Sequence, residues 1–462
     1  MVERRDLLTG LAFGAAATGL ALSDGRDAWA NWGSIAPGYS PGEDFDGRLL
    51  VNKPRAYQVM EQAGVDGLVA LNPVNVFYLA NYLGYKVAQM YSFPAFAVLP
   101  RDPDETPFLI TSHVDLWNIA NSEREYPELM PYSFATNWQE YLDQGNWATP
   151  PAAGPATPWP VDPDNYVPRE AEWLAVQDHY NGLMSASSEY ALARALKESG
   201  LAKGTLAVDD WRIAKVLDRV GLDTVTCVEG DNIFRRIRQI KSDVEIGHMR
   251  TAARANRAAA EAMFKRIDKG ATRADIDRMF MEEAAARGAK ATWIAAGGVG
   301  GLPDGEVVEG RPLLMDAVSQ INLYHGDFGR TFVLGEPSKK LGQRAALMRT
   351  AWDEAFAALK PDRTYSDIRA VAQDAMKKTG LPMFGIGASP HSVGLQHTDE
   401  PFVDGLPFQK RDDLVLEEGM TLTVDFPYME PGWGACHLED LVVITKDGAE
   451  ALGRMDGPLV IG

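Results

Sequence analysis

The chain is poor in cysteine and has no excess of basic residues. Only Cys227 and Cys436 occur among its 462 residues, which excludes a disulfide-rich scaffold. A single bridge between them stays open, although Cys436 lies in a segment that we expect to be a functional strand. The formal net charge is −19, which argues against binding to nucleic acids or anionic membranes, because both need basic patches.

Long apolar runs are also absent, apart from one of moderate length at the N-terminus. Arg4 and Arg5 precede an apolar, small-residue run over residues 7–22, and Ala28-Trp29-Ala30 has the form of a cleavage site. The run is short and rich in glycine and alanine for a membrane span. Paired arginines before such a run favour bacterial export by the twin-arginine route. We therefore predict that residues 1–30 are an export signal and that the protein is periplasmic, with an uncleaved anchor as the alternative.

A chain of this length favours two domains. In residues 44–229, segments with helical periodicity alternate with short apolar runs, which predicts an α/β domain. We expect a helix over residues 48–64, closed by a glycine, and buried strands over residues 65–71 and 206–210. Two alternating segments around residues 101–105 predict a hairpin.

The second domain is expected over residues 230–462. It begins with a basic, amphipathic segment, residues 231–241, whose arginines we interpret as solvated or inter-domain charges. Ser242 and Glu245 have the spacing of a capping box. They predict the start of a long helix that continues to about Lys265.

Residues 147–163 are rich in proline and alanine and cannot form a regular helix or a central strand. The simplest interpretation is a solvent-exposed loop. A substrate lid or a dimer arm is the alternative, since long ordered loops are often functional. Trp147 and Trp159 would then suit contact with an apolar or cationic ligand.

Asp316 and Asp327 stand eleven positions apart in an apolar, β-prone stretch. An odd separation within one strand would put them on opposite faces, whereas a hairpin bend or a bulge between them would bring them together. Buried carboxylates are costly unless a cation or hydrogen bonds hold them. Two turn aspartates that cap a hairpin are the alternative.

Further candidate ligands follow in the C-terminal third. His391 stands in an H-x-x-G pattern, and Asp425 and Glu439 each lie among β-branched residues of a predicted strand. Together with Asp316 and Asp327 they amount to four carboxylates and one imidazole. This oxygen-rich set suits a pair of divalent ions such as Mn, Fe, Co or Zn better than a structural zinc ion.

These motifs resemble those of the pita-bread metallohydrolases: aminopeptidase P, prolidase, methionine aminopeptidase, creatinase and a lyase branch. Asp327-Phe-Gly-Arg-Thr331 matches the D-x-x-R-T motif of that family, which stands eleven residues after a first aspartate. His391-Ser-Val-Gly394 matches its H-x-x-G motif, and Glu439 matches its last glutamate. The resemblance covers nearly all of the chain after the leader. It implies a creatinase-type α/β N-terminal domain and an α+β pita-bread catalytic domain.

The resemblance also implies roles for single residues. Two divalent metal ions would be held by Asp316, Asp327, His391, Asp425 and Glu439, and would lower the pKa of a shared water towards neutrality. His391 and His397 are the expected catalytic histidines, and His397 would contact the substrate and the developing oxyanion unless it only caps a loop. Tyr324 and His437 are further candidates for contact with substrate. The substrate would be a small molecule or a short peptide, and the chain a homodimer.

Four departures from the pattern bear on the reaction. Asp425 stands where the family has a glutamate, His437 stands where it has an arginine, and His391 and His397 are six positions apart instead of seven. The peptidases also carry a histidine within about twenty residues before the first aspartate, and this chain has none there.

We therefore predict a metal-dependent hydrolase of Xaa-Pro or other small amide substrates and keep two alternatives. One is a lyase or a hydrolase of a non-peptide small molecule, as in the dimethylsulfoniopropionate-lyase and creatinase branches. The other is a metal-free member, either creatinase-like or a binding protein that has lost its chemistry.

Overall fold

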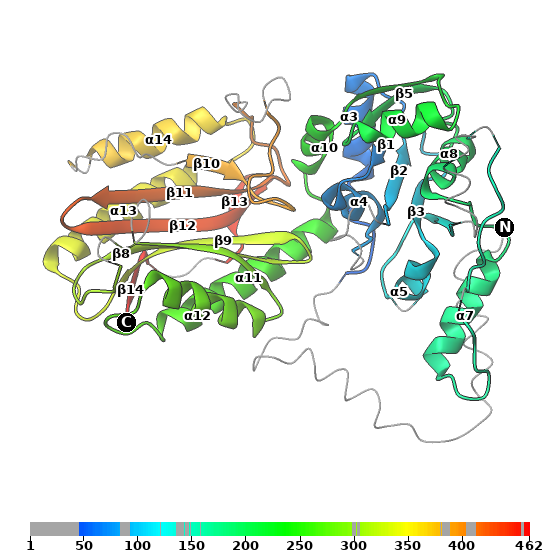
Figure 1. Cartoon of the computed structure of the whole chain (residues 1–462). Coiled ribbons are helices and arrows are strands. Elements are labelled where there is room, and N and C mark those ends of the chain that lie inside the picture. The colour runs from blue at the N-terminus through cyan, green and yellow to red at the C-terminus, as the bar shows by residue number, and fades with distance from the viewer. Residues whose placement is uncertain are drawn as a thin grey trace.

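The computed structural model describes residues 46–83, 93–120, 122–134, 143, 147, 149–157, 159–297, 302, 305–378, 380, 389–402, 413–453 and 457–462. They form two lobes, each built around one sheet, with α10 (Asp231–Arg238) between them (Figure 1). The predicted export signal and the glycine-rich residues 298–301 lie outside the described residues.

The N-terminal lobe contains a six-stranded sheet with the order β4-β3-β2-β1-β5-β6. Its strands are β1 (Gly67–Ala70), β2 (Phe96–Pro100), β3 (Phe108–Ser112), β4 (Glu128–Tyr132), β5 (Gly204–Val208) and β6 (Val225–Glu229). Strands β2 and β3 form the predicted antiparallel hairpin. Helices lie around this sheet: α3 (Lys53–Ala63), α4 (Pro73–Ala80), α5 (Leu116–Ala120), α7 (Pro168–Tyr180), α8 (Ser188–Glu198) and α9 (Arg212–Arg219), with the 3-10 turn η2 (His113–Asp115).

Helix α3 begins later than the sequence predicts. Asn52 caps it by accepting a hydrogen bond from the backbone N–H of Arg55, and Pro54 occupies its first turn, where no intrahelical donor is needed. Gly64 ends the helix in the left-handed conformation, as predicted.

The C-terminal lobe contains an eight-stranded sheet with the order β10-β11-β12-β9-β8-β7, with β13 added to β12 and β14 added to β9. Its strands are β7 (Lys290–Gly297), β8 (Leu313–Ile321), β9 (Tyr324–Val333), β10 (Ser389–Ser392), β11 (Thr421–Glu430), β12 (Gly434–Thr445), β13 (Gly448–Ala451) and β14 (Leu459–Ile461). Its helices are α11 (Asp243–Phe264), α12 (Arg273–Ala285), α13 (Lys339–Ala358) and α14 (Tyr365–Lys378). The capping box at Ser242 begins α11 as predicted.

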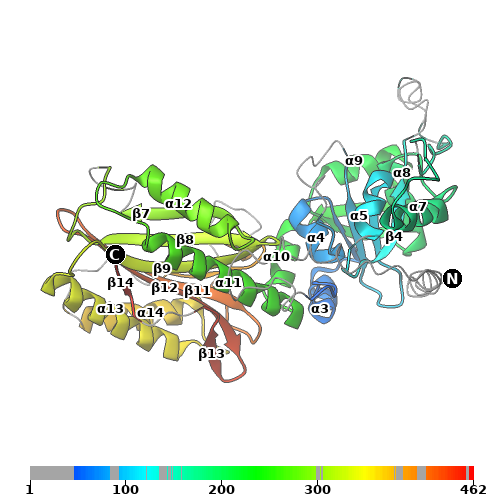
Figure 2. The same ribbon diagram turned by 90° about the horizontal axis from the view of Figure 1, so that it is seen from below.

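The four helices of this lobe all pack against the same face of its sheet. Helices α11 and α12 lie against the β7–β9 half, and α13 and α14 against the β10–β12 half (Figures 1 and 2). The core side chains beneath them include Ala317 and Phe328 in one half and Val424 and Leu438 in the other. Because side chains alternate along a strand, the residues between these positions point to the opposite face. The four helices therefore do not cover this opposite face of the sheet, where a functional site could lie.

Among the described residues, no helix is long and apolar enough to cross a membrane. Cys227 on β6 and Cys436 on β12 are both free, so the bridge left open by the sequence does not form. Trp147 and Trp159 both belong to the N-terminal lobe. The ring of Trp147 lies 4.7 Å from the Arg219 guanidinium, whereas Trp159 is half exposed beside His113.

Candidate metal centre

The two aspartates of the central stretch come together through a hairpin. Strands β8 and β9 are joined at Asn322 and Leu323, which both adopt positive φ. Asp316 lies opposite Gly329, and Asp327 lies opposite Val318. Directly opposed residues of antiparallel strands point to the same face, so both carboxylates reach the face that the helices leave free. Of the two arrangements that the sequence left open, the hairpin is the one that forms.

Strand pairing brings the other candidate ligands to the same face. Glu439 on β12 lies opposite Gly329, and the β11–β12 register places Asp425 beside Glu439. On β10, Ser389 pairs with Asp425, and His391 lies two positions further along. Five adjacent strands thus contribute one predicted ligand each.

The side-chain distances show one compact cluster. His391 Nε2 lies 3.8 Å from Asp327 Oδ2 and 3.7 Å from Glu439 Oε1. Asp316, Asp327 and Glu439 each offer an oxygen within 4.8 Å of the others, and so do Asp425 and Glu439 together with His437 Nε2. The five predicted ligands therefore lie close enough together to hold cations in common.

The carboxylate oxygens of this cluster fit a metal centre. Oδ1 of Asp316 and both carboxylate oxygens of Asp327 are buried and accept no hydrogen bond from the described residues. Glu439 accepts a hydrogen bond from a neutral donor, the Thr423 hydroxyl, at 2.9 Å. Buried carboxylate oxygens without donors are costly, and a divalent cation supplies the missing partner. The residues present therefore fit hard divalent cations.

In the absence of cations, protons bound to some of its side chains reduce the negative charge of the cluster. Burial raises the pKa of Asp316 and Asp327 well above the usual range, and the nearby charge of Glu439 raises it further. Burial would also raise the pKa of Glu439, but its contacts with His391 and His437 outweigh burial and lower it. Burial alone would lower the pKa of His391, yet Glu439 and Asp327 raise it to about 9. Asp316 and Asp327 therefore favour their protonated forms until positive charge is added.

Metal affinity should therefore rise with pH. The protons held by Asp316, Asp327 and His391 must leave before a cation can bind. Below the pKa of about 9 at His391, each such proton lowers the apparent affinity about tenfold per pH unit. Calorimetric Mn²⁺ titrations between about pH 6 and about pH 8 should show this trend and release protons to the buffer. An affinity that does not change with pH would contradict this account of the cluster.

His397 stands at the open edge of the cluster. Its Nε2 lies 3.1 Å from Asp327 Oδ2, and a quarter of its side chain is exposed. Its ring contacts that of His391, with centroids 4.9 Å apart, and meets the Trp293 ring edge-on at 4.4 Å. Burial and the charge of His391 lower the pKa of His397 to about 4. In the metal-free protein His397 is therefore a neutral imidazole, with Nε2 towards Asp327 and Nδ1 3.4 Å from the Thr398 hydroxyl oxygen.

The loop that carries His397 is held by α10. The guanidinium of Arg238 donates to both carboxylate oxygens of Asp399, at 2.7–3.2 Å, and to Oε1 of Gln396 at 3.1 Å. Arg238 and Asp399 are both buried, and Arg238 also contacts Asn75 of the N-terminal lobe. Of the two interpretations of the basic segment, the inter-domain one applies to Arg238. This ion pair ties the His397 loop to both lobes.

Removal of the Arg238 charge should destabilise the protein strongly. Arg238→Gln leaves the Asp399 carboxylate buried without its partner, which typically costs about 3–5 kcal/mol of unfolding free energy. Arg236→Gln on the exposed side of the same helix is the matched control and should change it by less than about 1 kcal/mol. Urea denaturation followed by circular dichroism measures both. Equal effects of the two substitutions would contradict the role of the buried pair.

Two residues that the sequence analysis expected to contact substrate, Tyr324 and His437, are buried. Tyr324 is fully buried, stacks on His248 and donates a hydrogen bond from its hydroxyl to Glu245, 3.2 Å away. It is three positions before Asp327 on β9 and so points to the other face of the sheet. The expectation that Tyr324 contacts substrate is therefore wrong. His437 is also fully buried, but it lies inside the carboxylate cluster instead of at its opening.

Trp293 is a site residue that the sequence analysis missed. It lies on β7 opposite Val318, beside a register shift in the β7–β8 pairing, and about a third of its surface is exposed. Its contact with His397 makes it one wall of the opening. Its place in an irregular edge strand gave no signal in the sequence.

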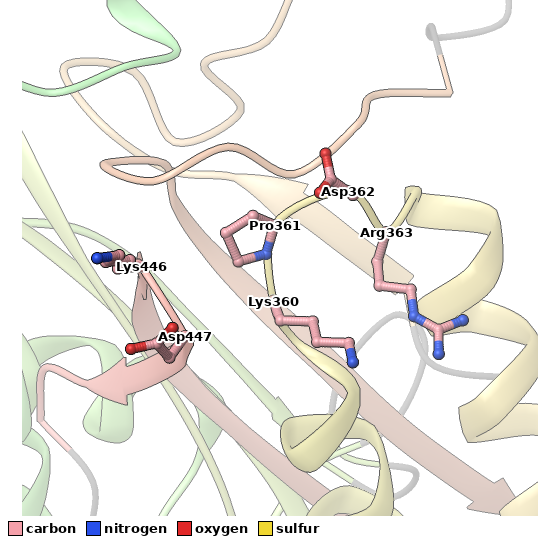
Figure 3. A pocket seen from close by; sticks show the side chains of 6 residues that line it. All are labelled: Lys360, Pro361, Asp362, Arg363, Lys446 and Asp447. Atoms are coloured by element: carbon pink, nitrogen blue, oxygen red, sulfur yellow. The ribbon is translucent and has the colours of Figure 1, made fainter.

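A hollow in the surface lies away from this cluster. It is lined by Lys360, Pro361, Asp362, Arg363, Lys446 and Asp447, and lies between the α13–α14 connection and the β12–β13 turn (Figure 3). None of these residues is a candidate ligand, and acidic and basic side chains alternate around it. The carboxylate and histidine cluster is therefore the better candidate for chemistry.

Comparison with known proteins agrees with the motif resemblance. Residues 247–446 match the model of metallopeptidase family M24. The chain is 27% identical over 307 residues to the probable dipeptidase PepE of Mycobacterium tuberculosis, which covers 63% of this chain and 76% of that one. It is also 27% identical over 239 residues to the Xaa-Pro dipeptidase of Pyrococcus furiosus, which covers 50% of this chain and 67% of that one.

Solved structures share the fold over most of the chain. The Xaa-Pro dipeptidase from Bacillus anthracis superposes with a TM-score of 0.62 at 20% identity, covering 89% of this chain and 99% of that one. The prolidase from Pyrococcus furiosus gives a TM-score of 0.58 at 19% identity, covering 87% and 99%. The predicted fold, an α/β N-terminal domain followed by a pita-bread catalytic domain, is confirmed.

Proposed function

We propose that this chain, a metallohydrolase with a domain of metallopeptidase family M24, cleaves dipeptides or short peptides with proline after the scissile bond. The observation that carries the proposal is that buried carboxylate oxygens of Asp316 and Asp327, beside His391, accept no hydrogen bond from the described residues. Two of the relatives described above are named for Xaa-Pro dipeptides, which suggests the substrate class.

The metal centre would be held by Asp316, Asp327, His391, Asp425 and Glu439. Two divalent ions bound there would supply a polarised carbonyl and a water of lowered pKa. Asp327 and Glu439 are buried, which limits the access of water to this part of the cluster. Thr423 and the β-ladder fix the orientation of Glu439.

His397 and Trp293 would act on the substrate. The neutral imidazole of His397 faces the opening beside Asp327, so its N–H can donate to the oxygen of the carbonyl as negative charge develops there. Trp293 presents an apolar ring at the same opening and can pack against the ring of a proline residue.

A substrate screen with metal-loaded protein tests this proposal. The protein should be incubated with Mn²⁺, Co²⁺ or Zn²⁺ and offered Gly-Pro, Xaa-Pro-Pro peptides and matched Xaa-Ala peptides. Release of an N-terminal residue from the proline substrates, and its absence after chelation, is the expected result. If metal-loaded protein leaves all of these peptides intact, the peptidase assignment is wrong.

One observation favours a second reaction, an elimination or the hydrolysis of a non-peptide small molecule. The chain has no histidine between His248 and His325, where the peptidases of the resembled family carry one before the first ligand. Turnover in ¹⁸O-labelled water separates the two reactions. Hydrolysis places the label in the product, whereas elimination does not.

We also propose export and self-association. The twin-arginine pattern at residues 1–30 supports a periplasmic location, and the dimeric state follows from the family resemblance alone. Cell fractionation with N-terminal sequencing of the mature protein tests the first, and light scattering of purified protein tests the second. Cytoplasmic retention with an intact N-terminus would contradict export, and a monomeric mass would contradict dimerisation.

A further inference from the structure

His437 extends from β12 into the middle of the carboxylate cluster. Its Nε2 lies 2.6 Å from Asp425 Oδ1 and 3.4 Å from Glu439 Oε2, and its side chain is only 2% exposed. These three side chains form one of the groups that could hold a cation, with ligand atoms within 4.8 Å of one another. The Nε2 atom of His437 therefore lies among the carboxylate oxygens that could hold a cation.

The second ring nitrogen fixes how His437 presents the first. Nδ1 lies 3.3 Å from the backbone carbonyl oxygen of Met315. A carbonyl oxygen can only accept a hydrogen bond, so Nδ1 carries a proton. In the metal-free protein Nε2 donates a second hydrogen bond, to Asp425 Oδ1. A cation that binds beside Asp425 would displace this second proton, which leaves the electron pair on Nε2. His391 has the same arrangement, with Nδ1 3.5 Å from the Ser392 carbonyl and Nε2 toward the carboxylates. Histidines that bind metal are oriented in this way by a hydrogen bond from the other nitrogen.

Gly329 provides the space for this ring. Gly329 lies between Asp316 and Glu439 in the sheet, and a Cβ atom there would overlap the His437 imidazole carbon Cε1. Any larger residue at position 329 would push the ring away from the cluster. The absence of a side chain at Gly329 therefore allows the His437 ring to reach the carboxylates.

Charge favours a ligand over a counter-ion. Two divalent cations would balance the four carboxylates of the centre, so an imidazolium at His437 would add a positive charge next to bound cations and be repelled. A neutral imidazole has no such penalty and offers an electron pair. Asp425 is also a short side chain, and the His437 ring fills the space beside its carboxylate.

The geometry points to His437 as an additional ligand of the metal centre, a second imidazole beside His391. This inference rests on the proposed dinuclear metallohydrolase and adds to it a nitrogen donor next to Asp425 and Glu439. Nitrogen donors strengthen binding of Co²⁺, Ni²⁺ and Zn²⁺ relative to Mn²⁺. The centre should therefore prefer these later metals more strongly than a centre with a single imidazole.

X-ray absorption of the Co²⁺-loaded protein tests the inference, because it counts imidazole ligands without reference to activity. With two ions bound, His391 and His437 together should give about one imidazole per cobalt, and His391 alone about half of that. His437→Asn should lower the count by this half. His179→Asn, on the exposed end of α7 in the other lobe, is the control and should leave it unchanged.

Two further variants separate a ligand from a counter-ion. His437→Arg keeps a positive partner for Asp425, and Gly329→Ala keeps the histidine but displaces its ring. Both should lower Co²⁺ affinity at least about tenfold, the cost of losing even an outer partner of a metal ligand, with a smaller loss for Mn²⁺. Wild-type affinity in His437→Arg would show that His437 only supplies charge and would overturn the inference.

The outcomes also separate this inference from the proposed function. A wild-type protein that binds two cobalt ions with a count that His437→Asn does not change would overturn the role of His437 alone. A wild-type protein that binds no cobalt would overturn the dinuclear centre and, with it, this inference. The wild-type count is informative even if a variant fails to fold.

Discussion

Asp327→Ala should abolish both metal binding and hydrolysis. Asp327 lies between the two groups of side chains that could hold cations, since it belongs both with Asp316 and Glu439 and with His391 and His397. Its loss removes an oxygen from both positions at once. Elemental analysis should find the variant free of metal after dialysis, and turnover should fall to the level of the blank.

The stability of this variant distinguishes a metal ligand from a structural residue. Neither oxygen of Asp327 accepts a hydrogen bond from the described residues, and burial disfavours its charge. Its removal relieves the cost of burying a carboxylate and loses the contacts with His391 and His397, so the metal-free protein should stay about as stable as before. A structural aspartate would instead give a less stable protein when it is replaced.

Asp447→Ala, at the hollow of Figure 3, is the control and should keep metal and activity. Full activity in Asp327→Ala would contradict the dinuclear mechanism.

His397→Ala should keep the metal and lose most of the rate. The side chain is a quarter exposed and stands at the opening, where it would donate a hydrogen bond to the developing oxyanion. Removal of one such donor typically costs about 10²–10³ in kcat. KM should change much less, because the interaction strengthens in the transition state. Steady-state kinetics and elemental analysis on the same sample measure both effects.

The conservative variant His397→Gln provides the matched control. Its amide can still donate a hydrogen bond from nearly the same place, so it should recover part of the lost rate. His397 also lies 3.1 Å from Asp327 and could itself hold a cation with Asp327 and His391. Loss of metal in His397→Ala would therefore make His397 a ligand and contradict its assignment as a substrate donor.

The sequence was sufficient for the fold class because its signals were local. The capping box at Ser242, the glycine that ends α3 and the alternating segments of β2 and β3 each depend on neighbouring residues only. The order of motifs from Asp316 to Glu439 could be found for a related reason. Each motif is a short local pattern on a single strand, so it can be recognised without knowing how the strands pair. The pairing of adjacent strands then brings the motifs together.

The parts that failed depended on contacts between distant segments. The eleven-residue separation of Asp316 and Asp327 allowed a hairpin or a bulge, and only the turn at Asn322 and Leu323 decides between them. Tyr324 adjoins the motif in sequence but points into the core, because it lies an odd number of residues from Asp327.

Arg238 and His437 show the same limit. An amphipathic helix has a buried side, but the sequence could not tell that both lobes close over Arg238 or that its partner would be Asp399. His437 reaches the carboxylates because Gly329, which lies opposite Glu439 on the neighbouring strand, has no side chain and leaves room for the His437 ring. Neither arrangement follows from spacing along the chain.

The most direct test of the account is the metal content of protein purified without chelator, measured by elemental analysis together with protein concentration. The account predicts about two divalent transition-metal ions per chain, in line with two-metal hydrolytic centres. Asp327→Ala prepared in parallel should contain none. A wild-type protein that stays free of metal even after reconstitution with Mn²⁺, Co²⁺ or Zn²⁺ would contradict the central claim.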